Sequence, residues 1–292
     1  MTAAGPASPW LPTSPCAPDP CARHTGPAAG PVLAAARLAA GLAAVLTGVL
    51  LAPLTAALPG TARRALVRGW CRTVLRAFGV RITVTGASAP AEGPLLVVAN
   101  HISWLDIPLI AAVLPGRMLA KREVRAWPVL GPLAARGGTL FIDRDRLRAL
   151  PDTVRAMARA LAGGGRVIVF PEGSTWCGRR GGAFRPAAFQ AALDASAAVQ
   201  PVRLVYRPAG PAAFVGDDPL AASLWRIVTA REITAEIRIL DPISIVQYPD
   251  RRALALAAQR AVASDSANRP SVSVHQRVSS RPASASSLRT PA

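Results

Sequence analysis

The chain has 292 residues, enough to bury a sizeable core, which predicts one large domain with appendages. Its formal net charge is +18, almost all from arginine, so its surface favours anionic partners such as anionic lipid, phosphorylated substrates or nucleic acid. Aromatic residues make up only 5% and no glycine-aromatic RNA-binding motif occurs, so no nucleic acid is expected as a partner. The cysteines match neither a zinc motif nor a dense disulfide framework, which predicts free thiols in a reducing compartment: Cys16, Cys21, Cys71 and Cys177.

The N-terminal region divides into a low-complexity tail and an apolar run. Residues 1–30 are rich in proline, alanine, glycine and serine without periodicity, which predicts a disordered tail. Residues 38–58 carry no charge and are long enough to cross a bilayer, for which about 20 residues suffice, although Pro53 weakens a spanning helix. We expect this run to associate with a membrane, either spanning it or lying at its interface. A signal peptide and a buried core helix are the alternatives.

The charges around the apolar run predict its orientation. Arg23 and Arg37 precede the run, and a larger group of arginines follows closely: Arg63, Arg64, Arg68, Arg72 and Arg76. The positive-inside rule then holds the following domain on the cytoplasmic side of the cell membrane.

Residues 61–78 have the pattern of a basic amphipathic helix. Apolar residues that include Trp70 and Phe78 recur at helical spacing, and arginines recur every four residues on another face. Such a helix suits a surface of anionic lipid; alternatively, it packs on its own domain and leaves the arginines in solvent. We assign residues 31–79 to membrane-associated helices, one apolar and one basic and amphipathic.

From residue 80 onward, short apolar runs alternate with helical patterns. The alternation indicates an α/β domain over residues 80–263, with a mixed, largely parallel sheet flanked by helices. The predicted strands are 80–86, 95–100, 117–122, 138–144, 166–172, 199–206 and 235–243. The predicted helices are 107–114, 124–135, 146–162, 184–196 and 250–263. Residues 264–292, rich in serine, alanine, proline and arginine, are predicted as a second disordered tail.

The stretch "NHISWLD" (100–106) places polar residues at the end of a strand, where ligands of such sheets tend to bind. Residues five apart on a continuous helix point about 140° apart, so His101 and Asp106 meet only if His101 lies in the turn before a helix that Asp106 helps to begin. Pro108 favours that helix start. An aspartate bonded to one ring nitrogen leaves the other free to take a proton from a substrate hydroxyl. Each residue alone also fits a structural role, Asp106 as a helix cap and His101 in a turn.

Two further strand ends carry polar residues. "VIVFPEGST" (167–175) ends in Glu172, Gly173, Ser174 and Thr175, which supply a carboxylate, a flexible backbone and two hydroxyl donors for a phosphate or ester oxygen. "GTLFIDRDR" (138–146) brings Arg144, a natural partner for a phosphate or carboxylate, to the same rim. An ordinary turn with an exposed glutamate is the alternative for the first of these.

The ordered set "NHISWLD", "GTLFIDR", "FPEGST" and "VQPVRLVY" over residues 80–245 resembles the four blocks of the glycerolipid acyltransferases, the lysophosphatidate acyltransferase family. The resemblance implies the fold of glycerol-3-phosphate acyltransferases and acyl transfer from acyl-CoA or acyl-carrier protein to a lipid hydroxyl. It also implies that the reaction needs no metal, no cofactor and no covalent enzyme intermediate. The donor is then a co-substrate, and membrane lipids and the lysophospholipid acceptor are the partners.

The resemblance also implies a role for each matching residue. His101 is the general base and Asp106 orients it within the Asn100–Asp106 block. Arg144 contacts the anionic headgroup of the acceptor. The remaining residues shape the substrate sites, Pro201 on the acyl-donor side: Asn100, Glu172, Gly173, Ser174, Thr175 and Pro201.

The third block departs from the pattern of members that use lysophosphatidate, many of which carry an arginine soon after the Gly-Thr. Here Trp176 and Cys177 follow, and Arg179 and Arg180 come later. This run, with "FVGDDPLAASLWRI" (214–227), resembles a branch that includes lyso-ornithine-lipid acyltransferases. The expected function is acylation of 1-acyl-sn-glycerol 3-phosphate to phosphatidate in phospholipid biosynthesis, with lyso-ornithine lipid or another lysolipid as the alternative acceptor. A hypothesis of another class is a non-catalytic basic protein that binds membrane or nucleic acid.

Overall fold

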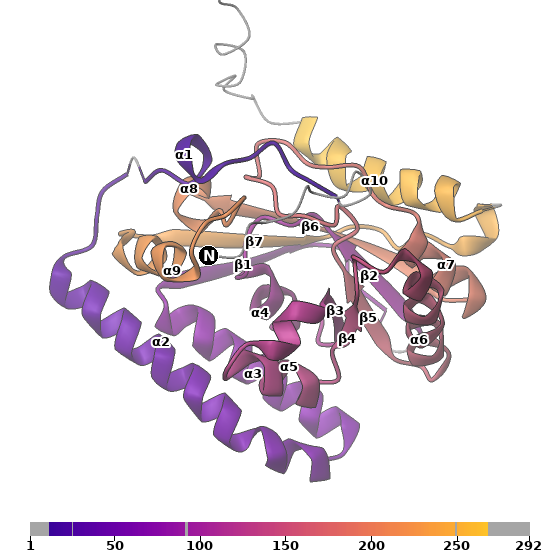
Figure 1. The fold of residues 1–292 in the computed structure, drawn as a ribbon, viewed down its shortest axis with the longest axis horizontal. Coiled ribbons are helices and arrows are strands. Elements are labelled where there is room, and N and C mark those ends of the chain that lie inside the picture. The colour runs from indigo at the N-terminus through magenta and orange to yellow at the C-terminus, as the bar shows by residue number, and fades with distance from the viewer. Residues whose placement is uncertain (1–11, 25, 91–92, 249, 268–292) are drawn as a thin grey trace, which may run out of the picture.

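A seven-stranded sheet forms the centre of the protein, and helices cover both of its faces (Figure 1). The computed structural model describes residues 12–24, 26–90, 93–248 and 250–267. The strand order is β1-β7-β6-β2-β5-β3-β4; neighbouring strands are parallel except for the antiparallel pair β6–β7. The strands are β1 (Val80–Gly86), β2 (Leu95–Ala99), β3 (Arg117–Lys121), β4 (Leu140–Ile142), β5 (Arg166–Val169), β6 (Ala198–Arg207) and β7 (Ile233–Ile239). The predicted α/β class with a mixed, largely parallel sheet is therefore confirmed.

The central strand β2 is buried on both faces and alternates between two hydrophobic cores. Leu95 and Val97 belong to the core shared with α3 (Gly60–Ala77), α4 (Asp106–Ala111) and α9 (Leu220–Thr229). Leu96 and Val98 belong to the core shared with α6 (Leu150–Ala162), α7 (Ala187–Asp194) and α10 (Arg251–Ala267). This two-sided burial explains the continuous apolar run in the sequence.

Most predicted helices occur with shifted bounds, and α9 was not predicted. The helix predicted over 124–135 is divided into η2 (Arg122–Ala126) and α5 (Leu130–Arg136), because Pro128 interrupts it. The helix predicted over 146–162 begins with η3 (Leu147–Ala149) before α6. Helix α10 continues past the predicted boundary at residue 263, and residues 268–292 of the predicted C-terminal tail lie outside the described residues.

The apolar run folds into a helical hairpin rather than an isolated helix. Helix α2 (Pro31–Leu51) continues into η1 (Ala52–Ala57), and α3 returns antiparallel to α2. The two helices approach closely at glycines, since a Cβ on Gly41 would lie 2.1 Å from the Phe78 ring and one on Gly48 would lie 2.3 Å from the Trp70 ring. The Trp70 Nε1–H donates to the carbonyl of Ala44 at 2.8 Å. Small residues thus allow two aromatic side chains to join the helices.

Both ends of the hairpin are attached to the sheet domain. At its start, Ala28 bridges to Ala230, and Arg37 donates to the carbonyls of Val228, Ala230 and Arg231. At its end, α3 leads directly into β1. Helix α2 with part of η1, Pro31–Thr55, is long and apolar enough to cross a membrane, but only by length and composition. Both ends of the hairpin therefore lie on the same domain.

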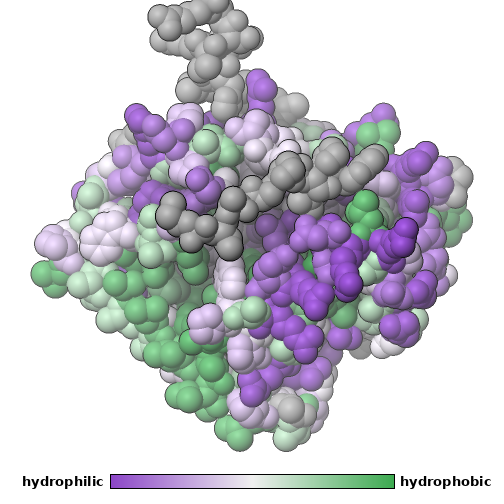
Figure 2. Space-filling model, viewed as in Figure 1, coloured by the Kyte–Doolittle hydropathy of each residue, from purple (hydrophilic) through white to green (hydrophobic). Residues whose placement is uncertain are grey.

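The structure decides between the two interpretations of the amphipathic segment. The apolar face of α3, including Cys71, Val74, Leu75 and Phe78, is buried in the core of the domain. Of the two alternatives the packed helix is the one observed, because the rings of Trp70 and Phe78 pack on α2 and, for Phe78, on Trp104 at 5.7 Å between centroids. The exposed apolar surface lies instead on α2 and η1, where Figure 2 shows hydrophobic residues gathered: Val32, Leu33, Leu42, Leu46, Leu50, Leu51 and Leu54.

The N-terminal segment also differs from the prediction. Residues 1–30 were predicted as a disordered tail, yet from residue 12 onward the segment packs on the domain and includes α1 (Pro18–Cys21). Cys16 and Cys21 are buried against Cys177, Ala213 and Val215. A composition of proline and small residues does not reveal such anchoring, because it depends on individual contacts such as the two buried cysteines and the backbone hydrogen bond from Arg231 to Pro27. Residues 1–11 lie outside the described residues.

The close approach at Gly41 predicts opposite effects of alanine at two helical glycines. Gly69 lies on the exposed side of α3 with nothing within 4 Å of a Cβ, so Gly69→Ala should stabilise the protein by about 0.5–1 kcal/mol through helix propensity. Gly41→Ala forces the Phe78 ring to move and should destabilise it by about 1–3 kcal/mol. Thermal unfolding in detergent measures both changes; a melting temperature raised by Gly41→Ala would contradict the packing described.

Candidate active site

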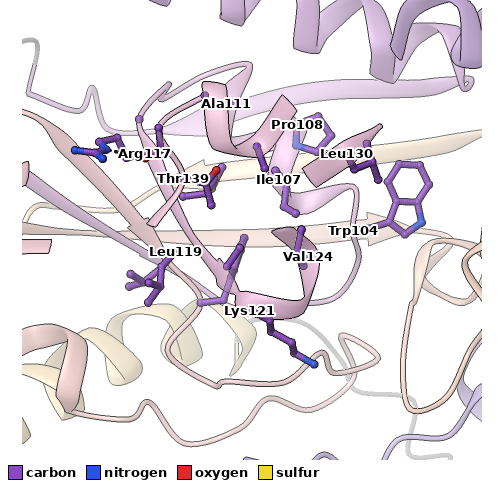
Figure 3. Close-up of a pocket in the computed structure, with 18 of the residues that line it drawn as sticks. Trp104, Ile107, Pro108, Ala111, Arg117, Leu119, Lys121, Val124, Leu130 and Thr139 are labelled. Atoms are coloured by element: carbon purple, nitrogen blue, oxygen red, sulfur yellow. Dashed lines mark hydrogen bonds between the residues drawn. The ribbon is translucent and has the colours of Figure 1, made fainter. Parts of the chain in front are cut away.

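A groove of about 2100 Å³ opens beside the carboxyl ends of β2, β3 and β5 and reaches the α2–α3 hairpin. Typical small-molecule pockets occupy roughly 300–1,000 Å³, so the groove is large enough for a substrate with a long chain. In Figure 3, apolar side chains from α4, η2 and α5 lie around this space: Ile107, Pro108, Val124 and Leu130. Polar residues line the same groove, among them His101, Lys121, Arg144 and Ser174.

His101 and Asp106 lie together in the geometry expected from their spacing. Helix α4 begins at Asp106, and His101 lies in the turn before it, so the two side chains meet with Nδ1 of His101 2.8 Å from Oδ2 of Asp106. The His101 side chain is 20% exposed and lines the groove, whereas that of Asp106 is fully buried. The histidine therefore connects a buried carboxylate to a space that a substrate can reach.

The carboxylate of Asp106 is the acceptor in each of its four hydrogen bonds. Oδ2 accepts the backbone N–H groups of Ile102 at 2.6 Å and Ser103 at 2.9 Å, besides the imidazole. Oδ1 accepts the hydroxyl of Tyr206 at 2.6 Å. Burial, followed by the charge of Asp106 and this hydrogen bond, raises the pKa of Tyr206, which keeps the phenol protonated. Because an ionised carboxylate only accepts, His101 carries its hydrogen on Nδ1 and leaves Nε2 with a free lone pair.

A second carboxylate, that of Glu172, fixes the backbone around His101. Oε2 accepts the backbone N–H of His101 at 2.8 Å, and Oε1 accepts that of Gly182 at 3.0 Å. Burial raises the pKa of Glu172 to about 7, against the lowering effect of these two hydrogen bonds and with a further increase from the charge of Asp106. Glu172 is 4% exposed and does not line the groove. It therefore joins the turns at His101 and Gly182 from the interior of the protein.

The imidazole ring is also held from its face. Phe170, at the end of β5, stacks on His101 with ring centroids 4.0 Å apart and an interplanar angle of 14°. The backbone N–H of Trp176 donates to the carbonyl of His101 at 2.7 Å. Stacking and backbone contacts leave the ring little freedom to turn, which keeps its remaining nitrogen directed at the groove.

Two cations lie together at the ends of neighbouring strands in the groove. Lys121 ends β3 and Arg144 follows β4. Burial, followed by the charge of Arg144, lowers the pKa of Lys121, and Glu123 opposes that effect. Burial likewise lowers the pKa of Arg144, with Glu123 again opposing. An exposed lysine and a half-buried arginine, with Glu123 near both, form a site that an anionic group would stabilise.

The remaining predicted residues fall into two groups. Gly173, Ser174 and Thr175 line the groove, and the Ser174 hydroxyl is buried without a hydrogen-bond partner among the described residues. Asn100 and Pro201 do not line it. The Asn100 amide pairs with the backbone of Leu204 at 2.8 and 3.0 Å, and Pro201 is buried in β6 opposite Val98. These two residues join strands β2 and β6 rather than contact the groove.

Comparison with known proteins identifies the family. A family model described as Acyltransferase matches residues 81–205. A lyso-ornithine lipid O-acyltransferase of Pseudomonas aeruginosa is 40% identical over 213 residues, which cover 70% of this chain and 81% of that protein. The chain belongs to the acyltransferase family. A 1-acyl-sn-glycerol-3-phosphate acyltransferase of Neisseria meningitidis is 36% identical over 202 residues, covering 67% of this acyltransferase and 78% of the relative.

The fold of the acyltransferase agrees with a solved structure. The 1-acyl-sn-glycerophosphate acyltransferase PlsC of Thermotoga maritima superposes with a TM-score of 0.59 at 20% identity, covering 80% of this chain and 99% of that one. The family and the fold predicted from the sequence are thus confirmed. The hypothesis of a non-catalytic basic protein rested on net charge alone, and family membership favours the enzyme.

Several residues of the acyltransferase site have no role predicted from the sequence, although Tyr206 ends "VQPVRLVY" and Phe170 begins "FPEGST". Tyr206 lies a hundred residues after Asp106, and no local pattern pairs them. Phe170 ends an apolar run typical of a strand, in which an aromatic residue is expected to be part of the hydrophobic core. Lys121 offered a signal, because it is the only lysine of the chain and lies one residue before the end of a predicted strand, at the same rim as Arg144.

The raised pKa of Glu172 predicts that the acyltransferase loses stability as pH rises. Between the ordinary pKa of 4.5 and the folded value of about 7, the folded chain holds a proton that the unfolded chain has released. Its contribution to stability therefore falls across this window, by roughly 3 kcal/mol in all. Denaturant unfolding from pH 5 to 8 should show Glu172→Gln becoming more stable relative to wild type as pH rises.

Glu232→Gln is the matched control for this experiment. Glu232 pairs with Arg81 at the surface, with half of its side chain exposed, so its removal should leave the pH slope of the wild type unchanged. Parallel stability curves for wild type and Glu172→Gln would show that the glutamate ionises in the folded state as it does in the unfolded one.

Proposed function

We propose that this acyltransferase transfers an acyl group from acyl-CoA or acyl-carrier protein to the free hydroxyl of a lysophospholipid. One observation carries the proposal: a histidine held at Nδ1 by a buried aspartate presents its other nitrogen to a long groove with apolar walls and a cationic end. A base, an anion site and space for a hydrocarbon chain are what acylation of a lysophospholipid needs.

The reaction follows from the state of His101. Its Nε2 accepts the proton of the acceptor hydroxyl while the hydroxyl oxygen attacks the carbonyl carbon of the thioester. Asp106 stabilises the imidazolium that forms. The C–S bond of the tetrahedral intermediate then breaks, and the leaving thiolate takes the proton back from His101. The proposed sequence uses no metal, no other cofactor and no covalent enzyme intermediate.

The cationic end of the groove supports binding of an anionic headgroup. Lys121 and Arg144 supply charge, and Arg144 supplies a planar pair of donors suited to phosphate or carboxylate. The unpartnered hydroxyl of Ser174, with Thr175 beside it, supplies further hydrogen bonds. We assign Glu172 and Asn100 to positioning His101 and the adjoining strands, and we leave Pro201 outside the acyl-donor site because it is buried in β6.

We further propose that the enzyme lies on the cytoplasmic side of the cell membrane with the α2–α3 hairpin inserted into one leaflet. The exposed leucines of α2 and η1 supply apolar area, and five arginines follow them on α3. Since both ends of the hairpin lie on the domain, the proposal favours interfacial insertion over a spanning helix.

We propose 1-acyl-sn-glycerol 3-phosphate as the acceptor, which makes phosphatidate the product in phospholipid biosynthesis. Its phosphate fits the pair of cations in the groove, and the relative from Neisseria meningitidis carries this activity in its name. Lyso-ornithine lipid is the second candidate. The higher identity to the lyso-ornithine lipid O-acyltransferase of Pseudomonas aeruginosa favours it, and its carboxylate also suits Lys121 and Arg144.

Replacement of His101 tests the mechanism. His101→Ala removes the base and should lower the rate of acyl transfer by about 10²–10⁴-fold. It also removes a donor to the buried Asp106 and the ring that stacks on Phe170, so the melting temperature should fall, and the rates are compared at a temperature at which both proteins are folded. The assay uses purified full-length protein with a radiolabelled acyl donor. Near-normal transfer by a folded His101→Ala variant would contradict the proposed role of the histidine.

A panel of acceptors tests the substrate assignment with the same protein. It contains 1-acyl-sn-glycerol 3-phosphate, lyso-ornithine lipid, lysophosphatidylcholine and uncharged monoacylglycerol, each with acyl-CoA and with acyl-carrier protein. Preference for the first supports the main proposal, and preference for the second supports the alternative. Equal rates with monoacylglycerol would contradict an anion site at Lys121 and Arg144.

Charged substitutions on the hairpin test membrane insertion. Leu46 is 51% and Leu50 76% exposed on α2, and the double substitution Leu46→Glu, Leu50→Glu should greatly reduce binding to vesicles of anionic phospholipid measured by sedimentation. The matched control is Val246→Glu with Leu256→Glu, which adds the same charge at residues 90% and 46% exposed near the opposite face of the sheet. Equal loss of binding in both variants would indicate charge repulsion without insertion.

A further inference from the structure

Three of the four cysteines meet at one place that the proposed reaction does not use. The sulfur atoms of Cys16, Cys21 and Cys177 all lie within 4.8 Å of one another, and all three side chains are buried. Cys71 lies apart from them in α3, within the core of the domain. The sequence suggested scattered thiols because Cys177 is more than 150 residues from the other two, and only the fold brings it to them.

The cluster joins the N-terminal strap, residues 12–22, to the loop that follows β5. Cys16 lies two residues before α1, Cys21 ends this single turn, and Cys177 lies five residues beyond Glu172. Around the sulfur atoms pack Ala22, Ala213 and Val215, which form a small core separate from the two main ones. Such a small apolar contact area provides little stabilisation for a strap of this length.

We propose that these three sulfur atoms bind a thiolate-preferring divalent cation of the Zn²⁺ class. In a tetrahedral zinc site the Zn–S distance is about 2.3 Å, which separates two bound sulfurs by roughly 3.8 Å. The sulfur atoms lie within 4.8 Å of one another, so side-chain movements of up to about 1 Å bring them to the spacing of a zinc site. Three protein ligands leave the fourth position to a water molecule or a small thiol.

The chemistry of the cluster selects the cation. Thiolates favour Zn²⁺ and other soft cations over Mg²⁺ and Ca²⁺, which need oxygen ligands. Three thiolates around Zn²⁺ carry a net charge of −1, and the backbone N–H of Arg179 donates a hydrogen bond to the sulfur of Cys177. This donor, together with the guanidinium of Arg179 nearby, stabilises the negative charge of the complex.

A bound cation would fix the strap over the acceptor side of the groove. Pro12 covers Gly173 so closely that a Cβ on this glycine would lie 2.5 Å from the proline ring, and Pro12, Thr13 and Ser14 all line the groove. The carbonyl of Cys16 lies 3.3 Å from the Cβ position of Gly216, on the other side of the strap. Metal binding therefore controls the order of a wall of the substrate site without contributing to acyl transfer.

The experiment measures metal in the full-length protein purified in detergent with a non-thiol reductant. After equilibration with Zn²⁺ and removal of excess, wild type should contain about one zinc per chain by elemental analysis, and replacement of zinc by Co²⁺ should give a sulfur-to-cobalt charge-transfer band. Cys16→Ser, Cys21→Ser and Cys177→Ser should each lose most of the zinc and weaken the band. Cys71→Ser is the matched control and should keep both.

The metal content is measured without substrate, so its outcome is independent of the proposed acyl transfer. The proposal is overturned if wild type and Cys71→Ser hold no zinc and give no cobalt band, or if Cys177→Ser binds as much as wild type. An intact mass lower by two hydrogens that persists under the reductant, with no zinc bound, would identify a disulfide and also overturn it. The cobalt spectrum of wild type needs no variant, so a cysteine variant that fails to fold does not affect the test.

Discussion

The buried carboxylate of Asp106 is the constraint on which the site depends. It accepts two backbone N–H groups from the turn that precedes α4, the imidazole N–H of His101 and the hydroxyl of Tyr206 from β6. Removing one donor would leave one acceptor position of this buried carboxylate unsatisfied, which costs more than the loss of one surface hydrogen bond. The same four bonds therefore fix the turn, the helix start, the neighbouring strand and the tautomer of the histidine.

Sequence patterns predicted this fold well because its central strands are buried on two faces and separated by helices. All seven predicted strands occur, and the geometric argument that His101 precedes the helix begun by Asp106 holds in the structure. The patterns did not reveal the contacts that depend on a partner distant in the sequence. The amide of Asn100 pairs with the backbone of Leu204, and the carboxylate of Glu172 accepts the backbone N–H groups of His101 and Gly182. Both residues therefore hold the backbone of the site in place without lining the groove.

The same limit explains the errors in the N-terminal region. An arginine-rich amphipathic pattern is equally suited to lipid and to a protein core, and only the contacts of α3 show that its aromatic residues pack inward. Residues 12–30 have the composition of a tail, but three cysteine side chains gather two distant segments. Composition averages over a segment, whereas anchoring depends on a few side chains.

The hairpin and the site are parts of one structure rather than an anchor and a separate catalytic domain. Phe78, at the end of α3, meets Trp104 edge-on, and Trp104 lies in the turn between His101 and α4 while its indole N–H donates to Ser223 of α9. The groove that reaches His101 is also lined by Leu42, Val45 and Leu46 of α2. A hydrocarbon chain in this groove therefore stays in contact with apolar side chains from the hairpin to the histidine. With the hairpin inserted as proposed, an acceptor would leave the bilayer without exposing that chain to water, which would cost about 0.8 kcal/mol for each CH₂ group.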